Sequence, residues 1–158
     1  MPPIVEAPDV PSPRTIPFSA HNKKELATWW RCRARLLADA ISFQPERQRL
    51  ILFGDSITES WRGTSYGSRI ARAKGVPTIL NSTLAARWPA PLPLGISADQ
   101  TQHLLWRMRN GEVSEPMKHD RQLMFVLLIG TNNLGRAMRV DETVRGITAC
   151  AEYLLNAT

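Results

Sequence analysis

Cysteine and long apolar runs are both scarce in this sequence of 158 residues. Its two cysteines, Cys32 and Cys150, are too few to form a disulfide scaffold or a four-ligand zinc site by themselves, although one bridge between them is possible. The longest apolar run, residues 123–129, is too short to cross a bilayer as a helix, so we expect no membrane span. Residues 1–10 contain no apolar stretch, and we expect no cleavable secretory signal. Together these absences favour a reducing compartment, the cytoplasm.

Acidic residues are outnumbered, 14 against 20 basic ones, which gives a net charge of +6. Such an excess is typical of proteins that bind nucleic acid. Most of the basic residues are arginines, however, and they are scattered along the whole chain. The one tight cluster is Arg31, Arg33 and Arg35, whose alternate spacing does not place three side chains on one stripe of a helix. We interpret the cluster as a solvated helix face and expect no nucleic-acid partner.

Proline divides the chain into a short arm and a longer folded part. Half of the 12 prolines fall within residues 1–18, so residues 1–20 are predicted to form an extended, poorly ordered arm. From about residue 21 to residue 41, apolar side chains recur at three- and four-residue steps, which predicts an amphipathic helix. Its Trp29 and Trp30 are expected to pack in the core. Residues 21–158 are predicted to form one domain.

Three short apolar segments are predicted strands. They are residues 50–53, residues 92–96 and residues 122–129, and the last is continuously apolar, as in a sheet covered on both faces. A helix or loop–helix segment is expected from residue 57 into the 60s and 70s, while residues 78–88 are ambiguous between helix and strand. Strands that alternate with helices predict an α/β sandwich with a mainly parallel sheet.

Two aspartates are expected to cap later helices. Asp99 precedes a helical pattern that runs to residue 109 and stops at Asn110 and Gly111. Asp141 precedes a second pattern near the end of the sequence. Five apolar residues of that pattern are expected on its buried side: Val144, Ile147, Ala151, Leu154 and Leu155.

Ligands in parallel α/β folds bind beyond the carboxyl ends of the strands, so the turns that follow the strands are where chemistry is expected. In the first turn, Ser56 opens a predicted helix, where exposed N–H groups favour a nucleophilic hydroxyl and the oxyanion it creates. Capping of the helix by Asp55 or Ser56 is an equally good interpretation. The segment is not the G-x-S-x-G elbow, because Thr58 stands at the last position.

The other two turns contain possible partners for such a hydroxyl. Asn132, at the tip of the third predicted strand, is a neutral donor that could face an oxyanion, although residues 130–133 are also ordinary turn material. The backbone N–H groups of residues 97–99 could complete the pocket. The glycine spacing of residues 130–135 resembles that of a phosphate loop, but Arg136 and Ala137 replace its Lys and Ser/Thr, so no nucleotide is expected.

These turns resemble three sequence blocks of the GDSL, or SGNH, esterase and lipase superfamily. Residues 53–58 (FGDSIT) resemble the first block, residues 94–112 (beginning LGISADQTQH) the second, and residues 129–135 (IGTNNLG) the third. The long second block and the Thr-Asn-Asn of the third are most similar to the branch of platelet-activating-factor acetylhydrolase Ib catalytic subunits. Three blocks in the family's order make the resemblance specific.

The resemblance implies a three-layer, flavodoxin-like α/β/α fold that hydrolyses small ester or acetyl groups through an acyl-serine, without a metal or other cofactor. Ser56 is then the nucleophile, and its own N–H is one donor of the oxyanion hole. The Asn132 side chain is a second donor. The third is the main-chain N–H of Ala98, where the family has glycine, and a positive φ would strain the alanine. Three neighbours in the same blocks support them: Gly54, Asp55 and Gly130.

The family's D-x-x-H block, which supplies the catalytic base, has no counterpart in this sequence. None of His21, His103 and His119 has an aspartate three residues before it. Asp99 and His103, four residues apart on one predicted helix face, could pair, but they lie in the second block, where the family does not keep its base. We therefore expect the N-terminal part of such an enzyme, with an incomplete catalytic set.

The alternative is a non-catalytic pseudoenzyme or interaction protein that forms a homo- or heterodimer with related subunits. A shortened sheet would expose an edge and apolar surface that a partner could cover.

Overall fold

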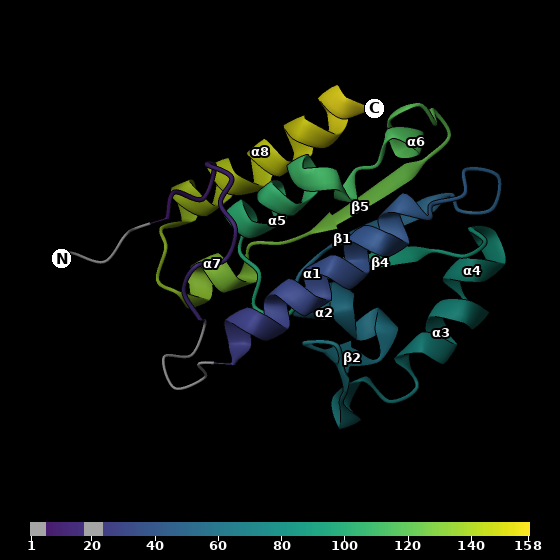
Figure 1. Cartoon of the computed structure of the whole chain (residues 1–158), viewed down its shortest axis with the longest axis horizontal. Helices are drawn as coiled ribbons and strands as arrows, with labels where there is room; N and C mark the ends of the chain where they lie inside the picture. The colour runs from purple at the N-terminus through teal and green to yellow at the C-terminus, as the bar shows by residue number, and fades with distance from the viewer. Residues whose placement is uncertain (1–5, 18–23) are drawn as a thin grey trace.

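A parallel three-stranded sheet lies at the centre of the computed structural model, which describes residues 6–17 and 24–158 (Figure 1). The middle strand, β1 (Leu50–Gly54), pairs in parallel with β4 (Leu92–Gly95) on one side and with β5 (Met124–Leu128) on the other. Parallel neighbours need crossover connections, which the helical segments between the strands supply. The predicted α/β class with a mainly parallel sheet is confirmed, as are the positions of the three strands.

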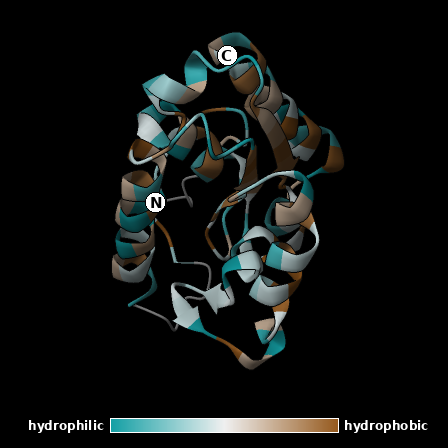
Figure 2. Ribbon diagram, turned by 90° about the vertical axis from the view of Figure 1, so that its right-hand side faces the viewer, coloured by the Kyte–Doolittle hydropathy of each residue, from teal (hydrophilic) through white to brown (hydrophobic). Residues whose placement is uncertain are grey.

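One face of this sheet is covered by α1 (Glu25–Ile41), α5 (Thr101–Arg107) and α8 (Val140–Ala157), which run alongside one another in Figure 1. All three strands contribute to the core beneath these helices, through Ile51, Phe53, Leu94, Phe125 and Leu127. Figure 2 shows the hydrophobic strands with helices on both sides.

The opposite face is covered only in part. Leu50 and Leu52 of β1 pack there against Leu80 of α3 (Val76–Ser82), with partly buried neighbours from α4 (Leu84–Arg87). The residues of β5 on this face are exposed: Met124 by 46%, Val126 by 42% and Leu128 by 46%. The expectation that this strand is covered on both faces is therefore wrong for the described structure, because the helices of this layer lie over β1 and do not cover β5.

The segment after β1 is less helical than expected. Helix α2 (Ser56–Glu59) and the 3₁₀ turn η1 (Ser60–Arg62) are followed by a small antiparallel hairpin of β2 (Thr64–Ser65) and β3 (Ser68–Arg69), and then by η2 (Ala71–Ala73). Positive φ angles at Gly63, Tyr66 and Gly67 turn the chain and end the helix. Residues 78–88, which were ambiguous in sequence, belong mainly to α3 and α4.

The helix after β4 begins one residue later than Asp99 would require. Gln100 is its N-cap and forms a reciprocal capping box with His103. Asp99 is fully buried, so the prediction that it caps this helix is wrong. The predicted stop is confirmed: within η3 (Met108–Glu112), Asn110 and Gly111 leave the helical region, and the short α6 (Glu115–Lys118) follows.

The last helix, α8, follows α7 (Thr131–Gly135) and presents only part of the expected stripe to the core: Leu154 is buried and Ile147 packs against the core, as predicted. Val144 and Leu155 are 52% and 80% exposed, so their predicted burial is wrong. The buried residues of α8 are Thr143, Gly146, Cys150 and Leu154. Its N-cap is Arg139, not Asp141. The close approach at Gly146, where an added Cβ would lie 2.2 Å from the Thr101 hydroxyl, sets the rotation of the helix.

Residues 6–17 of the proline-rich segment contact the domain through hydrogen bonds, while the arm of residues 1–20 as a whole stays a prediction. The Pro8 carbonyl accepts a hydrogen bond from Thr101 Oγ1 at 2.8 Å, and Ser12 N donates to the Gln102 carbonyl at 3.3 Å. Arg14 is only 2% exposed. Distant polar partners hold the segment, which local sequence patterns do not reveal. The predicted boundary between residues 20 and 21 lies outside the described residues and stays a prediction, as does the start of the first helix near residue 21.

Several side-chain expectations can be compared with the structure. Trp29 is fully buried, as predicted, but Trp30 is 44% exposed and stacks edge-on against Trp106.

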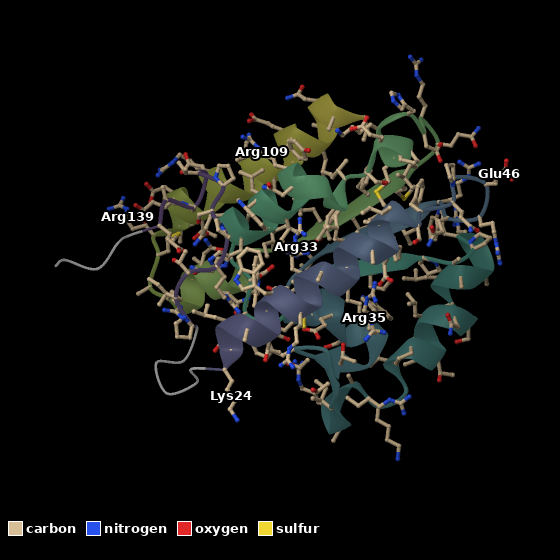
Figure 3. All side chains as sticks on the ribbon, in the orientation of Figure 1. Lys24, Arg33, Arg35, Glu46, Arg109 and Arg139 are labelled. Atoms are coloured by element: carbon tan, nitrogen blue, oxygen red, sulfur yellow. The ribbon has the colours of Figure 1, made fainter. Side chains whose placement is uncertain are left out.

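Arg33 and Arg35 project from opposite sides of α1 (Figure 3). Cys32 and Cys150 are both buried free thiols. Among the described residues, no helix is long and apolar enough to cross a membrane.

Candidate active site

The three turns singled out in the sequence meet at one edge of the sheet. Gly54 at the end of β1 is in register with Gly95 at the end of β4 and with Leu128 at the end of β5. Because the strands are parallel, the residues that follow these ends lie on the same side. Ser56, Ala98 and Asn132 therefore come from neighbouring turns.

Two glycines at these strand ends allow α2 to lie directly against the sheet. A Cβ on Gly54 would come within 2.2 Å of Thr58 Oγ1 and 2.3 Å of the Leu128 carbonyl oxygen. A Cβ on Gly95 would lie 2.5 Å from the backbone nitrogen of Glu59. Neither position has room for any other residue, so these glycines fix how closely Ser56 approaches the other two turns.

In the first turn, Asp55 and not Ser56 caps the helix. Asp55 is the N-cap of α2, and its Oδ1 accepts a hydrogen bond from Ile57 N at 3.0 Å. Ser56 is the first residue of the helix and is partly exposed. Within the described part of the chain, its hydroxyl and its N–H have no hydrogen-bond partner. The hydroxyl is therefore not used as a cap.

The Asn132 side chain links the first turn to the second. Its Nδ2 donates to the Asp99 carbonyl at 2.8 Å and to Asp55 Oδ2 at 3.2 Å. Burial raises the pKa of the Asp55 carboxyl. Gly130, with φ +115°, starts the turn that carries Asn132, and an added Cβ there would lie 2.9 Å from Ile147 Cδ1. The carboxamide is thus held between the other two turns by one hydrogen bond to each.

The second turn presents one backbone donor. Ser97 N donates to Glu59 Oε2 at 2.8 Å, and Asp99 N donates to the Ile96 carbonyl at 3.2 Å. Ala98 N, between them, has no partner among the described residues. Ala98 adopts φ +63°, the left-handed region that favours glycine, which a non-glycine residue enters at a cost of about 1 kcal/mol or more.

Asp99 and His103 do not form a catalytic pair. Asp99 accepts hydrogen bonds from Trp29 Nε1 at 2.6 Å and from Arg107 Nε at 2.8 Å. His103 Nδ1 lies 4.0 Å from Asp99 Oδ1 and instead accepts a hydrogen bond from Gln100 N. Its Nε2 faces Glu6 Oε2 at 3.0 Å.

The Glu6 carboxyl is stabilised in its charged form by this contact. Burial raises the pKa of Glu6, but hydrogen bonds from His103 and Thr15 outweigh burial and lower that pKa to about 2. The remaining described histidine, His119, is 80% exposed beside Glu115. Both described histidines are therefore occupied away from Ser56, and His21 lies outside the described residues.

A buried glutamate behind the site was not predicted. Glu59 is 2% exposed, and its carboxylate accepts five hydrogen bonds, two from Ser97 and three from the β2–β3 hairpin. It thereby joins the hairpin to the turn that carries Ala98. A carboxylate three residues after Ser56, on the side of α2 that meets Gly95, is its only sequence signal.

A buried ion network lies beneath the second turn. Arg107 is fully buried and donates to both Asp99 and Glu112, as well as to the Gly54 carbonyl at 3.1 Å. Burial raises the pKa of Glu112 to about 7 despite the nearby arginine. The network ties the ends of β1 and β4 to α5. Among the described residues, no group of three or more His, Cys, Asp or Glu side chains is arranged to hold a metal ion.

Comparison with known proteins agrees with this arrangement. The family model of the GDSL-like Lipase/Acylhydrolase family matches residues 52–157. Platelet-activating factor acetylhydrolase IB subunit alpha1 of Bos taurus is 29% identical over 149 residues, which cover 90% of this chain and 51% of that protein. For the Homo sapiens alpha1 subunit the identity is 29%, and for the Rattus norvegicus alpha2 subunit 26%, with 52% of each covered.

The chain thus spans about half the length of the curated relatives it matches. The family match includes all three strand-end turns, which the sheet brings together although its strand order, β4-β1-β5, differs from their order in the chain. The chain therefore belongs to the GDSL-like lipase/acylhydrolase family.

Proposed function

We propose that the chain contributes the nucleophile and the oxyanion hole for hydrolysis of small ester or acetyl groups. The observation that carries this proposal is the meeting of three turns at one sheet edge, with the partly exposed Ser56 hydroxyl unbonded among them. Membership of an acylhydrolase family and similarity to subunits named as acetylhydrolases support it. Neither a metal ion nor an organic cofactor is part of the proposed reaction.

In the proposed reaction, Ser56 Oγ attacks the acyl carbon and its proton passes to a base. The carbonyl oxygen becomes an oxyanion, which accepts hydrogen bonds from Ser56 N and Ala98 N and from Asn132 once its Nδ2 turns from Asp55. The intermediate collapses, the C–O bond breaks, and the alcohol leaves with the proton. Water then attacks the acyl-serine in the same way and releases the acid.

The base is the component that the described residues do not supply. His103 uses both ring nitrogens in contacts with Gln100 and Glu6, and His119 lies beside Glu115. We therefore propose that the base comes from residues outside the described set or from a partner chain. A serine without a base is a poor nucleophile, so the described part alone is expected to react slowly.

A fluorophosphonate probe tests this function, because it reacts with activated serines. The probe is applied to the chain alone. It is also applied to the chain mixed with the human alpha1 acetylhydrolase subunit, in a variant of that subunit whose own nucleophile has been replaced. We expect labelling of the wild type, faster in the mixture, and none of Ser56→Ala. The exposed Ser82→Ala is the matched control and is expected to label like the wild type. Equal labelling of Ser56→Ala, or no labelling under either condition, contradicts the proposal.

A second candidate function, a non-catalytic partner of related subunits, is favoured by the open face of β5. Exposed apolar side chains at Met124, Val126 and Leu128 form a strip that a partner could cover. Analytical ultracentrifugation of the chain with a related subunit tests it: a complex that Val126→Lys disrupts and Thr78→Lys does not supports pairing through this strip. A chain that remains monomeric in the mixture contradicts it.

A further inference from the structure

The N-terminal arm inserts one buried cation behind the second turn. Arg14 Nη1 donates to Glu25 Oε1 at 3.1 Å, to the Ser97 carbonyl at 3.3 Å and to the Tyr66 hydroxyl at 3.4 Å, and Nη2 donates to the Ala98 carbonyl. The guanidinium thus holds two successive carbonyls of the turn. Its planar fork suits this task, since its donors are fixed relative to one another.

These two bonds set the direction of the Ala98 N–H. The Ser97 carbonyl and the Ala98 N–H belong to one planar trans peptide, so they point in opposite directions. Drawing the Ser97 carbonyl toward Arg14 therefore turns the Ala98 N–H away from it. The second bond, to the Ala98 carbonyl, fixes the next peptide plane. With both planes fixed, Ala98 is held at φ +63° although it lacks the freedom of glycine.

A second clamp fixes the same turn from its other side. Glu59 accepts hydrogen bonds from Ser97 N at 2.8 Å and Ser97 Oγ at 2.6 Å. Glu59 thus anchors the residue before Ala98, whereas Arg14 holds the carbonyls on both sides of it. Arg14 is the only one of the two that contacts Ala98 itself.

We propose that Arg14 is a positioning residue, which holds Ala98 in the left-handed conformation so that its N–H faces the oxyanion of the reaction. This inference rests on the proposed function of Ser56 and adds a residue from the N-terminal arm, outside the three sequence blocks. Arg14 touches neither substrate nor nucleophile, and it acts through the backbone of Ala98.

A double-mutant cycle separates positioning from simple stabilisation. Arg14→Met keeps an unbranched side chain but removes every donor, and glycine at position 98 adopts a positive φ without strain. The rate of fluorophosphonate labelling of Ser56 is measured for the wild type, Arg14→Met, Ala98→Gly and the double variant. Unfolding midpoints are measured in parallel.

We expect Arg14→Met to slow labelling by about 100-fold, the effect of losing or displacing one oxyanion donor. In the Ala98→Gly background the same change is expected to slow labelling by about threefold or less. Glycine adopts the positive φ at position 98 without strain, so Arg14 is no longer needed to hold that conformation. Arg35→Met, an exposed arginine of α1, is the matched control with no expected change. An equal loss in both backgrounds overturns the proposal, since stabilisation alone acts on both alike.

Two further measurements keep the outcome clear. Glu25→Gln breaks the Arg14 ion pair without touching the turn, and is expected to lower the unfolding midpoint while leaving the labelling rate within about twofold. In NMR spectra, a strong intraresidue HN–Hα NOE reports the positive φ of Ala98. We expect Arg14→Met to weaken it and Arg14→Lys to restore it only in part.

These readouts distinguish the two proposals. If wild-type Ser56 is never labelled, the proposed function fails, and the NOE alone decides whether Arg14 holds Ala98. An unchanged NOE in Arg14→Met overturns the role of Arg14, whatever the reactivity of Ser56.

Discussion

The two faces of the central sheet are made by alternate residues of the same three strands, yet they are packed very differently. On one face, residues such as Phe53 and Leu94 are fully buried under α1, α5 and α8. On the other, Leu50 and Leu52 are buried, whereas Val126 and Leu128 of the neighbouring strand are nearly half exposed. Apolar residues of similar type thus contribute differently to stability, because the elements that cover a strand determine how much of its apolar surface is buried on folding.

The largest expected effect concerns the ion network on the covered face. Arg107→Met leaves the buried Asp99 and Glu112 carboxyls without their cation, and we expect a loss of about 3–5 kcal/mol in the free energy of unfolding. Lys118→Met breaks a solvent-exposed pair with Glu115 and is expected to be nearly neutral. Urea unfolding of both variants measures the difference. Equal losses would show that burial is not what separates them.

Two leucines of the sheet sharpen the comparison between its faces. Leu94→Ala, at a position with no exposed surface, is expected to lose about 2–5 kcal/mol of unfolding free energy. Leu128→Ala, at a position that is 46% exposed, is expected to lose less than about 1 kcal/mol. The same denaturation experiment measures both. If Leu128→Ala costs as much as Leu94→Ala, the open face is covered in solution.

Glycine substitutions test the close packing of α2 at the site edge. Gly95→Ala puts a Cβ 2.5 Å from the Glu59 backbone nitrogen, and we expect a loss of about 1–3 kcal/mol with displacement of Ser56. Gly135→Ala meets no atom within 4 Å and is expected to be nearly neutral. Thermal unfolding of both variants checks the order, and a neutral Gly95→Ala would mean that α2 can shift without penalty.

The effects of pH on stability are expected to have opposite signs at two glutamates. The pKa of Glu6 is lowered from 4.5 to about 2, so its contribution to stability is present above pH 4.5 and is lost as pH falls toward 2. The pKa of Glu112 is raised from 4.5 to about 7, so its contribution is present below pH 4.5 and is lost as pH rises toward 7.

Unfolding midpoints measured from pH 3 to pH 8 in Glu6→Gln and Glu112→Gln test these signs. Glu6→Gln is expected to flatten the acid limb of the curve, and Glu112→Gln the limb between pH 4.5 and 7. A variant that leaves its own limb unchanged would disprove the assignment for that residue.

The sequence predicted those features that depend on local pattern and on strand ends. The strands, the α/β class and the convergence of the turns at Ser56, Ala98 and Asn132 follow from short apolar runs and from the shared direction of parallel strands. The catalytic roles of these three residues stay predictions.

Features that depend on distant partners were missed. Aspartate suits an N-cap, so local sequence favours a cap at Asp99, but in the structure the Asp99 carboxylate is bound by Trp29 and Arg107. Arg14 has no sequence signal and Glu59 has only its spacing from Ser56, since Arg14 meets the turn from 83 residues away and Glu59 from 38. The exposure of β5 depends on which elements lie over it, a property that no strand encodes alone.

The docking of residues 6–17 has a consequence for how this protein opens. These residues form no helix or strand and are held to the domain by a few polar contacts, so they can open locally at low cost. Because they carry Arg14, their release would free the Ala98 turn while the sheet stays folded. Cleavage of the arm by a protease, or a shortened chain that starts at residue 24, is therefore expected to give a protein that still unfolds cooperatively. In that protein the Ala98 turn of the candidate site is no longer fixed.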